Sequence, residues 1–309
     1  MDRKHFLRAA GLGWGAAWLA GCARDGTPGS AGEGGAGDLS GGREQGDAAA
    51  APAGLQPALE TIGVQLYTVR SLMADDVAAT LDAVAQIGYD EVEFAGYFGH
   101  EPAVVRAWLD ASGLTAPAAH FDLGAITGSA LEETLEAAAV VGHRWLVVPW
   151  IPEEMRTSDG YREVADLLNT AGSIAAAAGI RVGYHNHAFE FDVLDGPADG
   201  GGGVTGYSLL LEHLDPAVAD LEIDFHWSAA AGVDALDLFA QRPGRFPLCH
   251  VKDLTTDGQM ADAGAGIIDW PGLFARSEEA GLVHYFVEHD QPADPLASIE
   301  ASYRYLAGM

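Results

Sequence analysis

The sequence predicts a (β/α)8 barrel over residues 59–309, and three observations support this fold class. Eight short apolar runs of strand-like composition recur along this part of the chain. Amphipathic segments with helical periodicity separate them, and several end in glycine, as helices commonly do. Eight strand–helix units within roughly 245 residues match the usual size of such a barrel, which is about 250 residues.

The predicted strands follow one another at regular spacing. They are IGVQLY (62–67), EVEFAG (91–96), APAAHF (116–121), WLVVPW (145–150), RVGYHNH (181–187), ADLEIDF (219–225), FPLCHVKD (246–253) and VHYFVEHD (283–290). An open, doubly wound sheet is the alternative, but no glycine-rich phosphate turn follows the first strand. The stretch DGPADGGGGVTG (195–206) interrupts the rhythm and is predicted to be a surface loop.

The charge of the chain narrows the choice of partners. Acidic residues number 45 and basic residues 16, for a formal charge of −29. Because such a surface repels phosphate backbones, nucleic acid is not expected as a partner. Cations and neutral small molecules are compatible with it, and the oligomeric state is left open.

Residues 1–22 have the character of a targeting segment. A basic region containing Arg3, Lys4 and Arg8 precedes the apolar stretch AAGLGWGAAWLAG (9–21), which is too short to span a bilayer. The ending LAGC resembles a bacterial lipobox and predicts lipidation of Cys22; cleavage by an ordinary signal peptidase is the alternative. RKHFL resembles a degenerate twin-arginine motif, so both the Tat and the Sec routes stay open.

A flexible linker is predicted between this segment and the barrel. Residues 23–58 are rich in Gly, Ala, Asp and Ser and have no apolar periodicity, so they cannot bury enough surface to offset ordering. The sequence therefore predicts an exported lipoprotein, tethered to a membrane through its lipid alone. Cys249, the other cysteine, is expected to be a buried apolar residue rather than a nucleophile.

Ionisable residues gather where the predicted strands end, which is where barrels of this class carry their active sites. Charged residues are rarely buried unpaired, so acids and imidazoles converging on one rim predict a divalent cation that compensates them. Carboxylate and imidazole ligands suit Mn²⁺, Mg²⁺, Co²⁺, Fe²⁺ or Zn²⁺. The candidates are Glu93, His120, His185, His187, Glu190, Asp224, His226, His250, Lys252, Asp253, Glu288, His289 and Asp290.

The motifs IGVQLYTVR, GYDEVEFAGYFG, YHNHAFEF, LEIDFHW, HVKD and YFVEHD resemble the sugar phosphate isomerase/epimerase family, the xylose-isomerase-like TIM barrels. The resemblance covers roughly residues 60–307 and extends to inosose dehydratases, ketose 3-epimerases and 3-keto-glycoside lyases. It implies one divalent metal ion, Mn²⁺ being the first expectation. On matching positions the implied ligands are Glu190, Asp224, His250 and Glu288, with His187 or His185 as the alternative to Glu190.

The chemistry expected of such a site starts from a sugar whose hydroxyl and keto oxygens chelate the cation, which polarises the carbonyl. Glu288 and Glu190 are the candidates for moving a proton at the neighbouring carbon. Lys252 either stabilises a developing enolate or pairs with Asp253 or another acid. Elimination follows where a leaving group lies β to the acidic carbon; epimerisation or isomerisation follows where it does not.

Substrate binding is expected at the same rim. The aromatic residues Tyr67, Phe94, Trp150 and Trp227 are candidates for packing on a sugar, with core filling as the alternative. Few arginines lie near the rim, which favours an unphosphorylated sugar. The expected substrate-binding residues are Glu93, Phe94, His120, His185, His187 and Trp227.

Two other functions stay open at this point. A tethered sugar-binding lipoprotein without catalytic activity would not need the acid/base pair Glu190 and Glu288. An apurinic-endonuclease-like phosphodiesterase shares the barrel, but the strongly negative charge disfavours it.

Overall fold

The computed structural model describes Leu59 and residues 61–195 and 203–309. The predicted targeting segment, the predicted lipidation site Cys22 and the predicted linker lie outside these residues. Within the described ranges, every helix is too short or too polar to cross a bilayer.

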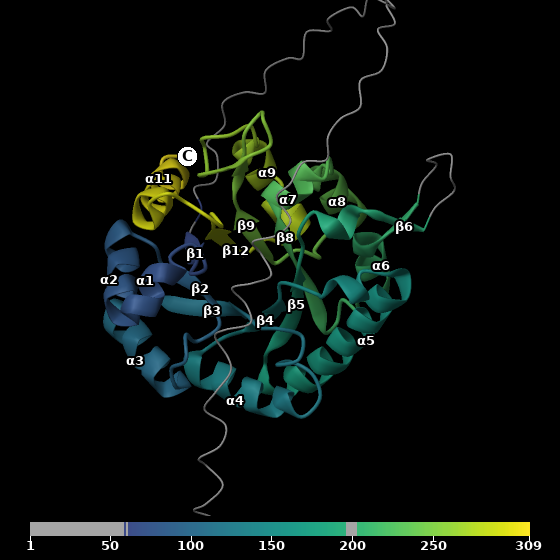
Figure 1. Ribbon diagram of the computed structural model, residues 1–309, viewed down its shortest axis with the longest axis horizontal. Coiled ribbons are helices and arrows are strands. Elements are labelled where there is room, and N and C mark those ends of the chain that lie inside the picture. Colours follow the sequence, from purple (N-terminus) through teal and green to yellow (C-terminus); the bar gives the residue numbers. More distant parts are fainter. Residues whose placement is uncertain (1–58, 60, 196–202) are drawn as a thin grey trace, which may run out of the picture. The chain divides into compact units, whose positions relative to one another are not determined.

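Eight parallel strands close into a barrel, which confirms the predicted fold class (Figure 1). Their order around the barrel is β1-β12-β9-β8-β5-β4-β3-β2. Each of the eight predicted runs coincides with one of these strands, although β3 begins one residue before its run. The strands are β1 (Gly63–Gln65), β2 (Glu91–Ala95), β3 (Thr115–His120), β4 (Trp145–Val148), β5 (Arg181–His185), β8 (Ala219–Asp224), β9 (Leu248–Val251) and β12 (His284–Val287).

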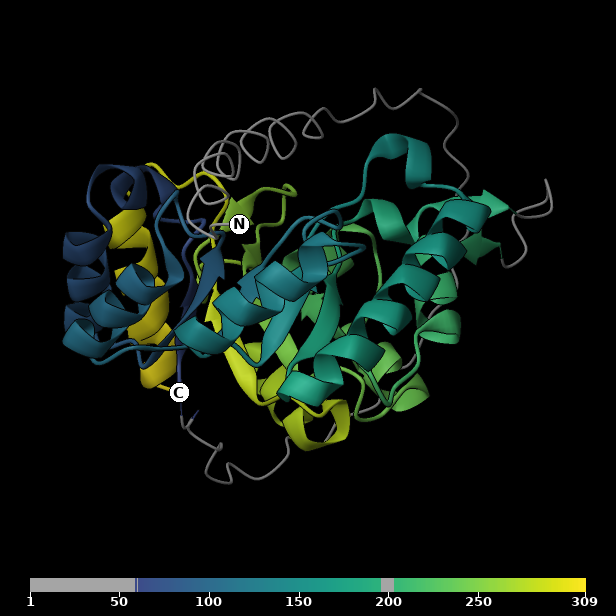
Figure 2. The same ribbon diagram turned by 90° about the horizontal axis from the view of Figure 1, so that it is seen from below.

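Helices surround the barrel and follow its strands (Figures 1 and 2). The α-helices are α1 (Arg70–Asp75), α2 (Val77–Ile87), α3 (Pro102–Ser112), α4 (Ala130–Val141), α5 (Ser158–Ala175), α6 (Gly206–His213), α7 (Phe225–Ala230), α8 (Ala235–Gln241), α9 (Trp270–Phe274), α10 (Ser277–Ala280) and α11 (Pro295–Ala307). Short 3-10 turns are η2 (Glu153–Met155), η3 (Ala176–Ala178) and η4 (Phe189–Phe191).

The helix boundaries follow from the local sequence. The Asp76 side chain caps α2 by accepting from the Ala79 amide at 3.0 Å. The same helix ends at Gly88, whose φ of +121° is a conformation that glycine adopts at little cost. Thr157 caps α5 by accepting from the Gly160 amide at 3.1 Å.

Two small hairpins extend from the barrel. β6 (Val193–Asp195) pairs antiparallel with β7 (Val204–Thr205). The surface loop predicted over residues 195–206 is therefore too long, because β7 and the first residue of α6 lie within it; residues 196–202 lie outside the described ranges. β10 (Asp253–Leu254) pairs with β11 (Met260–Ala261) after β9. The buried Asp253 carboxylate stabilises the chain after this hairpin by accepting from the Gly264 and Ile268 amides and the Trp270 indole.

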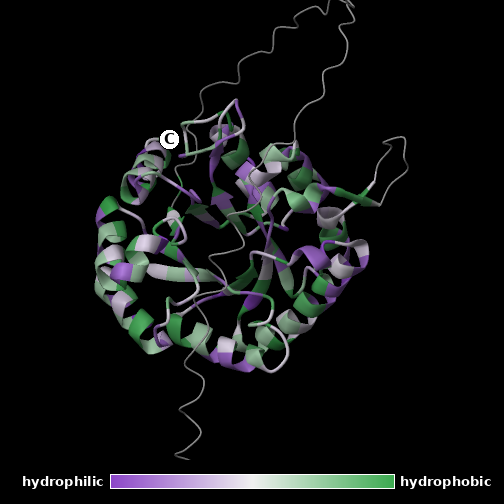
Figure 3. Ribbon diagram, viewed as in Figure 1, coloured by the Kyte–Doolittle hydropathy of each residue, from purple (hydrophilic) through white to green (hydrophobic). Residues whose placement is uncertain are grey.

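An apolar layer crosses the interior of the barrel. It consists of Ala118, Val147, Leu248 and Phe286. Phe286 fits because its neighbour across the sheet is Gly63, where a Cβ atom would lie 2.5 Å from the phenyl ring. Figure 3 shows hydrophilic segments on the central strands as well as on the outer helices. Polar residues lie on both sides of this apolar layer, Glu91 with His284 towards the amino ends of the strands and Glu93 with His250 towards the carboxyl ends.

The polar residues nearer the amino ends of the strands pair with one another. His284 Nδ1 lies 2.9 Å from both carboxylate oxygens of Glu91. Asp220 accepts from the Trp145 indole at 2.9 Å and pairs with Arg181. The residues nearer the carboxyl ends form the site described next.

Candidate active site

Successive strands direct polar side chains to the inside of the barrel near their carboxyl ends. Side chains alternate across a strand, so residues of one parity face inward. The register then places these residues beside one another: Gln65 lies opposite Glu93, and His185 opposite Glu222. Asp224 at the end of β8 lies opposite His250 of β9. The resulting cluster is Gln65, Glu93, His120, His185, Glu222, Asp224, His250 and Glu288.

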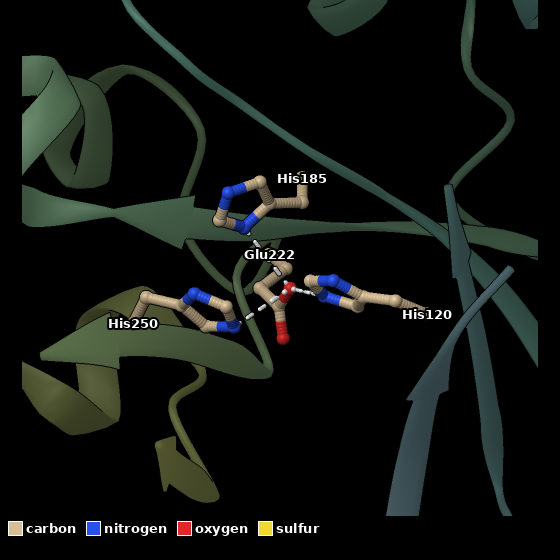
Figure 4. A group of neighbouring side chains, drawn as sticks. All are labelled: His120, His185, Glu222 and His250. Atoms are coloured by element: carbon tan, nitrogen blue, oxygen red, sulfur yellow. Dashed lines mark hydrogen bonds and ion pairs between the residues drawn. The ribbon is translucent and has the colours of Figure 1, made fainter. Parts of the chain in front are cut away.

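The deeper part of this cluster gathers three imidazoles around the carboxylate of Glu222 (Figure 4). From Glu222 Oε2, His120 Nε2 lies at 2.7 Å, His185 Nδ1 at 3.1 Å and His250 Nε2 at 3.3 Å. Glu93 Oε2 lies 2.7 Å from His250 Nε2 and accepts from the Gln65 amide at 2.8 Å. We call Glu93, His120 and Glu222, with the ring nitrogens that face them, the inner group.

A second set of possible metal ligands lies on the other side of the His250 ring. His250 Nδ1 is 2.8 Å from Glu288 Oε2 and 3.8 Å from Asp224 Oδ2. His185 Nε2 is 3.7 Å from the same Asp224 oxygen. We call Asp224 and Glu288, with the ring nitrogens that face them, the outer group. The ligand atoms of Asp224, His250 and Glu288 all lie within 4.8 Å of one another.

The Lys252 ammonium is buried beside the outer group. Its Nζ lies 2.9 Å from Asp224 Oδ2, 2.7 Å from Glu288 Oε2 and 3.0 Å from Asp290 Oδ1. Burial lowers the pKa of Lys252, but the three carboxylates outweigh this and hold the pKa well above its ordinary value. Lys252 therefore carries its charge, and its partners are these acids rather than the adjacent Asp253.

Burial also changes the protonation of the other groups. It lowers the pKa of His185 well below its ordinary value and that of His250 to about 3, so both imidazoles are neutral near pH 7. It raises the pKa of Asp224 to about 7 and that of Glu93 well above the ordinary value. Neutral imidazoles have lone pairs to offer a metal, and the raised pKa values indicate carboxylates that lack compensating positive charge.

Unpaired buried atoms and the set of possible ligands both bear on whether a cation fits. Glu93 Oε1 and Glu222 Oε1 are buried and have no hydrogen-bond partner among the described residues. Asp224, Glu288 and Asp290 share the single ammonium group of Lys252, and the buried carboxylates of Glu93 and Glu222 contact imidazoles and the Gln65 amide. Oxygen and imidazole nitrogen ligands suit Mn²⁺, Fe²⁺, Co²⁺ or Zn²⁺. The residues present therefore fit a divalent cation.

Aromatic side chains form the rim above the outer group. The His187 ring lies 5.2 Å from Trp150, 5.5 Å from Trp227 and 5.7 Å from Phe189, onto which it stacks. The Arg156 guanidinium lies over the Phe189 ring at 3.6 Å and over the Trp150 ring at 4.3 Å. His187 Nδ1 and Trp227 Nε1 are buried without a partner among the described residues. These two nitrogens can serve a polar ligand.

Glu190 lies outside both groups. Its Oε1 accepts from the Tyr184 hydroxyl at 2.8 Å, and its Oε2 accepts from the His187 amide at 2.8 Å. Tyr184 follows Gly183 on β5 and faces the helices, so Glu190 is held behind the strand. Burial raises the pKa of Glu190 to about 8. The structure thus brings together three of the four expected ligands and leaves Glu190 apart.

Phe94 also lies away from the cluster. It follows the inward-facing Glu93, so its side chain faces outward, where it is fully buried in the main core. Its ring packs 6.1 Å from Tyr97 and 6.0 Å from His143. The expected contact of Phe94 with a substrate therefore does not fit its position.

Glu222 is central to the inner group but was not among the predicted site residues, because those were taken only from the ends of the strands. Glu222 lies within β8, two positions before Asp224, and shares its inward face. The alternation Asp220, Glu222, Asp224 was the available signal, because an acid at every second position marks one face of a strand.

Fold and site together define the class: a (β/α)8 barrel with a buried centre of carboxylates and imidazoles at the carboxyl ends of its strands. The chain belongs to the xylose isomerase-like TIM barrel family, whose sequence profile matches residues 81–308. Among curated proteins, none matches the chain.

Several solved structures share the fold. A sugar phosphate isomerase/epimerase from Parabacteroides distasonis is 24% identical with a TM-score of 0.70, covering 83% of this chain and 96% of that one. The 3-keto-D-glucoside 4-epimerase of E. coli is 19% identical with a TM-score of 0.56, covering 81% and 99%. The IolI protein with a bound zinc atom is 14% identical with a TM-score of 0.60, covering 80% and 95%. At these identities the likeness shows the fold.

Proposed function

We propose that the protein is a divalent-metal-dependent sugar isomerase, epimerase or lyase, acting by proton abstraction next to a carbonyl. The observation that carries this proposal is the outer group, in which the ligand atoms of Asp224, His250 and Glu288 lie within 4.8 Å of one another and His185 Nε2 lies 3.7 Å from Asp224 Oδ2. Family membership supports the reaction class. Zinc in IolI supports a metal in a barrel of this kind.

The residues that would hold the ion are His185, Asp224, His250 and Glu288. Of the four ligands implied by family resemblance, Glu190 is replaced here by His185. A bound divalent cation supplies a Lewis acid that polarises a substrate carbonyl. Mn²⁺, Fe²⁺, Co²⁺ and Zn²⁺ all suit two imidazoles and two carboxylates.

The chain's own residues supply the remaining chemistry. Glu288 is the candidate base, because it is the outer carboxylate that follows its strand and lies at the rim beside Lys252. Lys252, held by Asp290, places a fixed positive charge where an enolate oxygen develops. Glu190 lies away from the ion in this arrangement. It accepts a hydrogen bond from the His187 amide and so positions the aromatic rim.

The rim favours an unphosphorylated sugar or keto-sugar. Rings of Trp150 and Trp227 offer apolar faces for the C–H side of a sugar, and His187 Nδ1 and Trp227 Nε1 are placed to meet hydroxyl groups. Cations near the rim are already engaged: Lys252 by three carboxylates, Arg156 over two rings, and Arg70 by the backbone oxygens of Tyr67 and Asp290. A phosphate group would therefore find little compensation there.

Metal analysis and a substrate panel test the proposal. Purified full-length protein is loaded with Mn²⁺ or Zn²⁺ and incubated with 3-keto-glycosides, inososes and free ketoses in deuterium oxide. Product structure and deuterium uptake, read by NMR, separate epimerisation from elimination. Turnover that Glu288→Gln abolishes and exposed Glu278→Gln leaves intact supports the proposal. Ligand binding without metal or turnover would instead indicate a sugar-binding lipoprotein.

We also propose that the protein is exported and anchored through lipid on Cys22. The sequence of residues 1–22 supports this proposal. Expression of the full chain with a labelled fatty acid tests it. The wild type should carry the label and sediment with membranes, and Cys22→Ala should lose both properties.

A further inference from the structure

Two histidines each present their two ring nitrogens to opposite carboxylates. His185 directs Nδ1 to Glu222 at 3.1 Å and Nε2 towards Asp224 at 3.7 Å. His250 does so with the atoms exchanged: Nε2 lies 2.7 Å from Glu93, and Nδ1 lies 2.8 Å from Glu288. The inner and outer groups therefore share the same two imidazole rings.

A neutral imidazole has one N–H and one lone pair, so only one of its nitrogens can donate a hydrogen bond. An ionised carboxylate only accepts. Each ring must therefore direct its proton to one side and its lone pair to the other. The donors available on the two sides decide which side receives the proton.

The inner carboxylates depend on the rings for donors. Glu93 and Glu222 are fully buried, and in the ionised forms that a neighbouring cation favours, the donors that reach them from the described residues are the Gln65 amide and the three imidazoles. The outer carboxylates Asp224 and Glu288 instead receive the Lys252 ammonium. Because a buried acceptor without a donor is costly, the ring protons belong on the inner side.

We infer that Glu222 and Glu93 are positioning residues that fix opposite tautomers of the two histidines. His185 is protonated on Nδ1 by its bond to Glu222, and His250 on Nε2 by its bond to Glu93. Both lone pairs then face the outer group, where they hold one cation with Asp224 and Glu288. A carboxylate behind a ligand histidine fixes its tautomer and raises its basicity. The inference rests on the proposed function.

The competing arrangement is an ion in the inner group. His120, His185, Glu222 and His250 offer ligand atoms that all lie within 4.8 Å of one another, as those of Asp224, His250 and Glu288 do in the outer group. An ion there would take the lone pairs of His185 Nδ1 and His250 Nε2. Ions in both groups would need each ring to be deprotonated on both nitrogens. The two sites are therefore distinguished by which ring nitrogen carries hydrogen.

NMR of protein labelled with ¹⁵N-histidine shows which ring nitrogen of each histidine carries hydrogen. The measurement is made on the metal-free protein and on protein loaded with ¹¹³Cd²⁺. His143 and His226 are internal standards, because their Nδ1 atoms face the backbone carbonyls of Ala116 at 2.7 Å and Asp253 at 2.9 Å and must donate. We expect His185 to match these standards and His250 to show the Nε2–H tautomer. Cadmium should couple to His185 Nε2 and His250 Nδ1, at one ion per chain.

Other results have distinct meanings. Identical tautomers for the two rings, cadmium coupling to His185 Nδ1 and His250 Nε2, or two ions per chain would each overturn the inference while leaving a metal enzyme. Failure to bind any divalent metal would overturn the proposed function instead. The tautomers of the metal-free protein still test the inference in that case.

Substitution of the inner carboxylates gives a second measurement. Glu222→Leu should weaken metal affinity about 10–100-fold, as loss of a hydrogen-bond partner behind a ligand typically does. Glu222→Gln keeps an accepting oxygen and should recover part of that loss. Glu91→Gln is the matched control, since Glu91 is buried on β2 but pairs with His284 below the apolar layer. Equal affinity in wild type and Glu222→Leu would contradict the inference.

Discussion

Lys252 Nζ lies 2.7 Å from Glu288 Oε2, and both side chains are buried at the mouth of the barrel. The ammonium also contacts Asp224, so it lies beside the two carboxylates that we assign to a cation. A positive charge is thus built into the site, and the metal-free fold depends on it.

Lys252→Met should destabilise the metal-free protein by about 3–5 kcal/mol, because removing one partner of a buried ion pair leaves uncompensated charge. Saturating Mn²⁺ or Zn²⁺ should raise the melting temperature of this variant more than that of the wild type, since the ion supplies the missing charge. Differential scanning calorimetry with and without metal measures both effects. Arg304→Met, which removes a surface pair with Glu300, is the control and should change stability by less than about 1 kcal/mol.

Glu190 should make the stability of the metal-free protein depend on pH. Burial raises its pKa to about 8 in the folded state, whereas the unfolded carboxyl titrates near 4.5. Its stabilising contribution is therefore complete below about pH 4.5 and is lost as the pH rises through 8. Urea unfolding between pH 5 and 8 should show a decline that Glu190→Gln reduces by up to about 1.4 kcal/mol per pH unit. The exposed neighbour Asp192→Asn should keep the wild-type slope; identical slopes in all three proteins would refute this assignment.

The apolar layer should be sensitive to added volume at Gly63. A Cβ atom there would lie 2.5 Å from the Phe286 ring, so Gly63→Ala should cost about 1–3 kcal/mol in the free energy of unfolding. Gly183→Ala is the matched change on β5, where the nearest atom, Val147 Cγ2, is 3.3 Å away, and it should cost less. Phe286→Leu should partly rescue Gly63→Ala. A larger cost at Gly183 would contradict the packing described.

The aromatic rim should affect substrate binding more than turnover. Trp150→Leu should raise KM roughly 3–10-fold with little change in kcat, because ring stacking contributes about 0.5–1.5 kcal/mol. Phe94→Leu should lower stability and leave KM unchanged, since Phe94 packs on Tyr97 and His143 in the core. Steady-state kinetics on whichever substrate the panel identifies would measure both. A raised KM in Phe94→Leu alone would place the substrate elsewhere.

Much of the architecture could be read from the chain because strand periodicity is a local property. Each apolar run coincides with one barrel strand, and the acids and imidazoles at Asp224, His250 and Glu288 lie where such strands end. The alternation of side chains along a strand also explains two errors: Phe94 was predicted to bind substrate, and Glu222 was not predicted to belong to the site. Neighbours such as Glu93 and Phe94 cannot both face inward, and Glu222 shares the inward face with Asp224 although it precedes the strand end.

By itself the sequence determined the eight strand–helix units, the acidic charge and the kinds of groups available at the carboxyl ends of the strands. Tertiary structure decided which of these groups meet. Glu190 lies behind β5 and accepts from Tyr184, and Lys252 pairs with acids from other strands. His185 and His250 lie between two sets of carboxylates. These contacts join strands far apart in the sequence, so they depend on barrel closure and register. No local pattern in the chain contains that information.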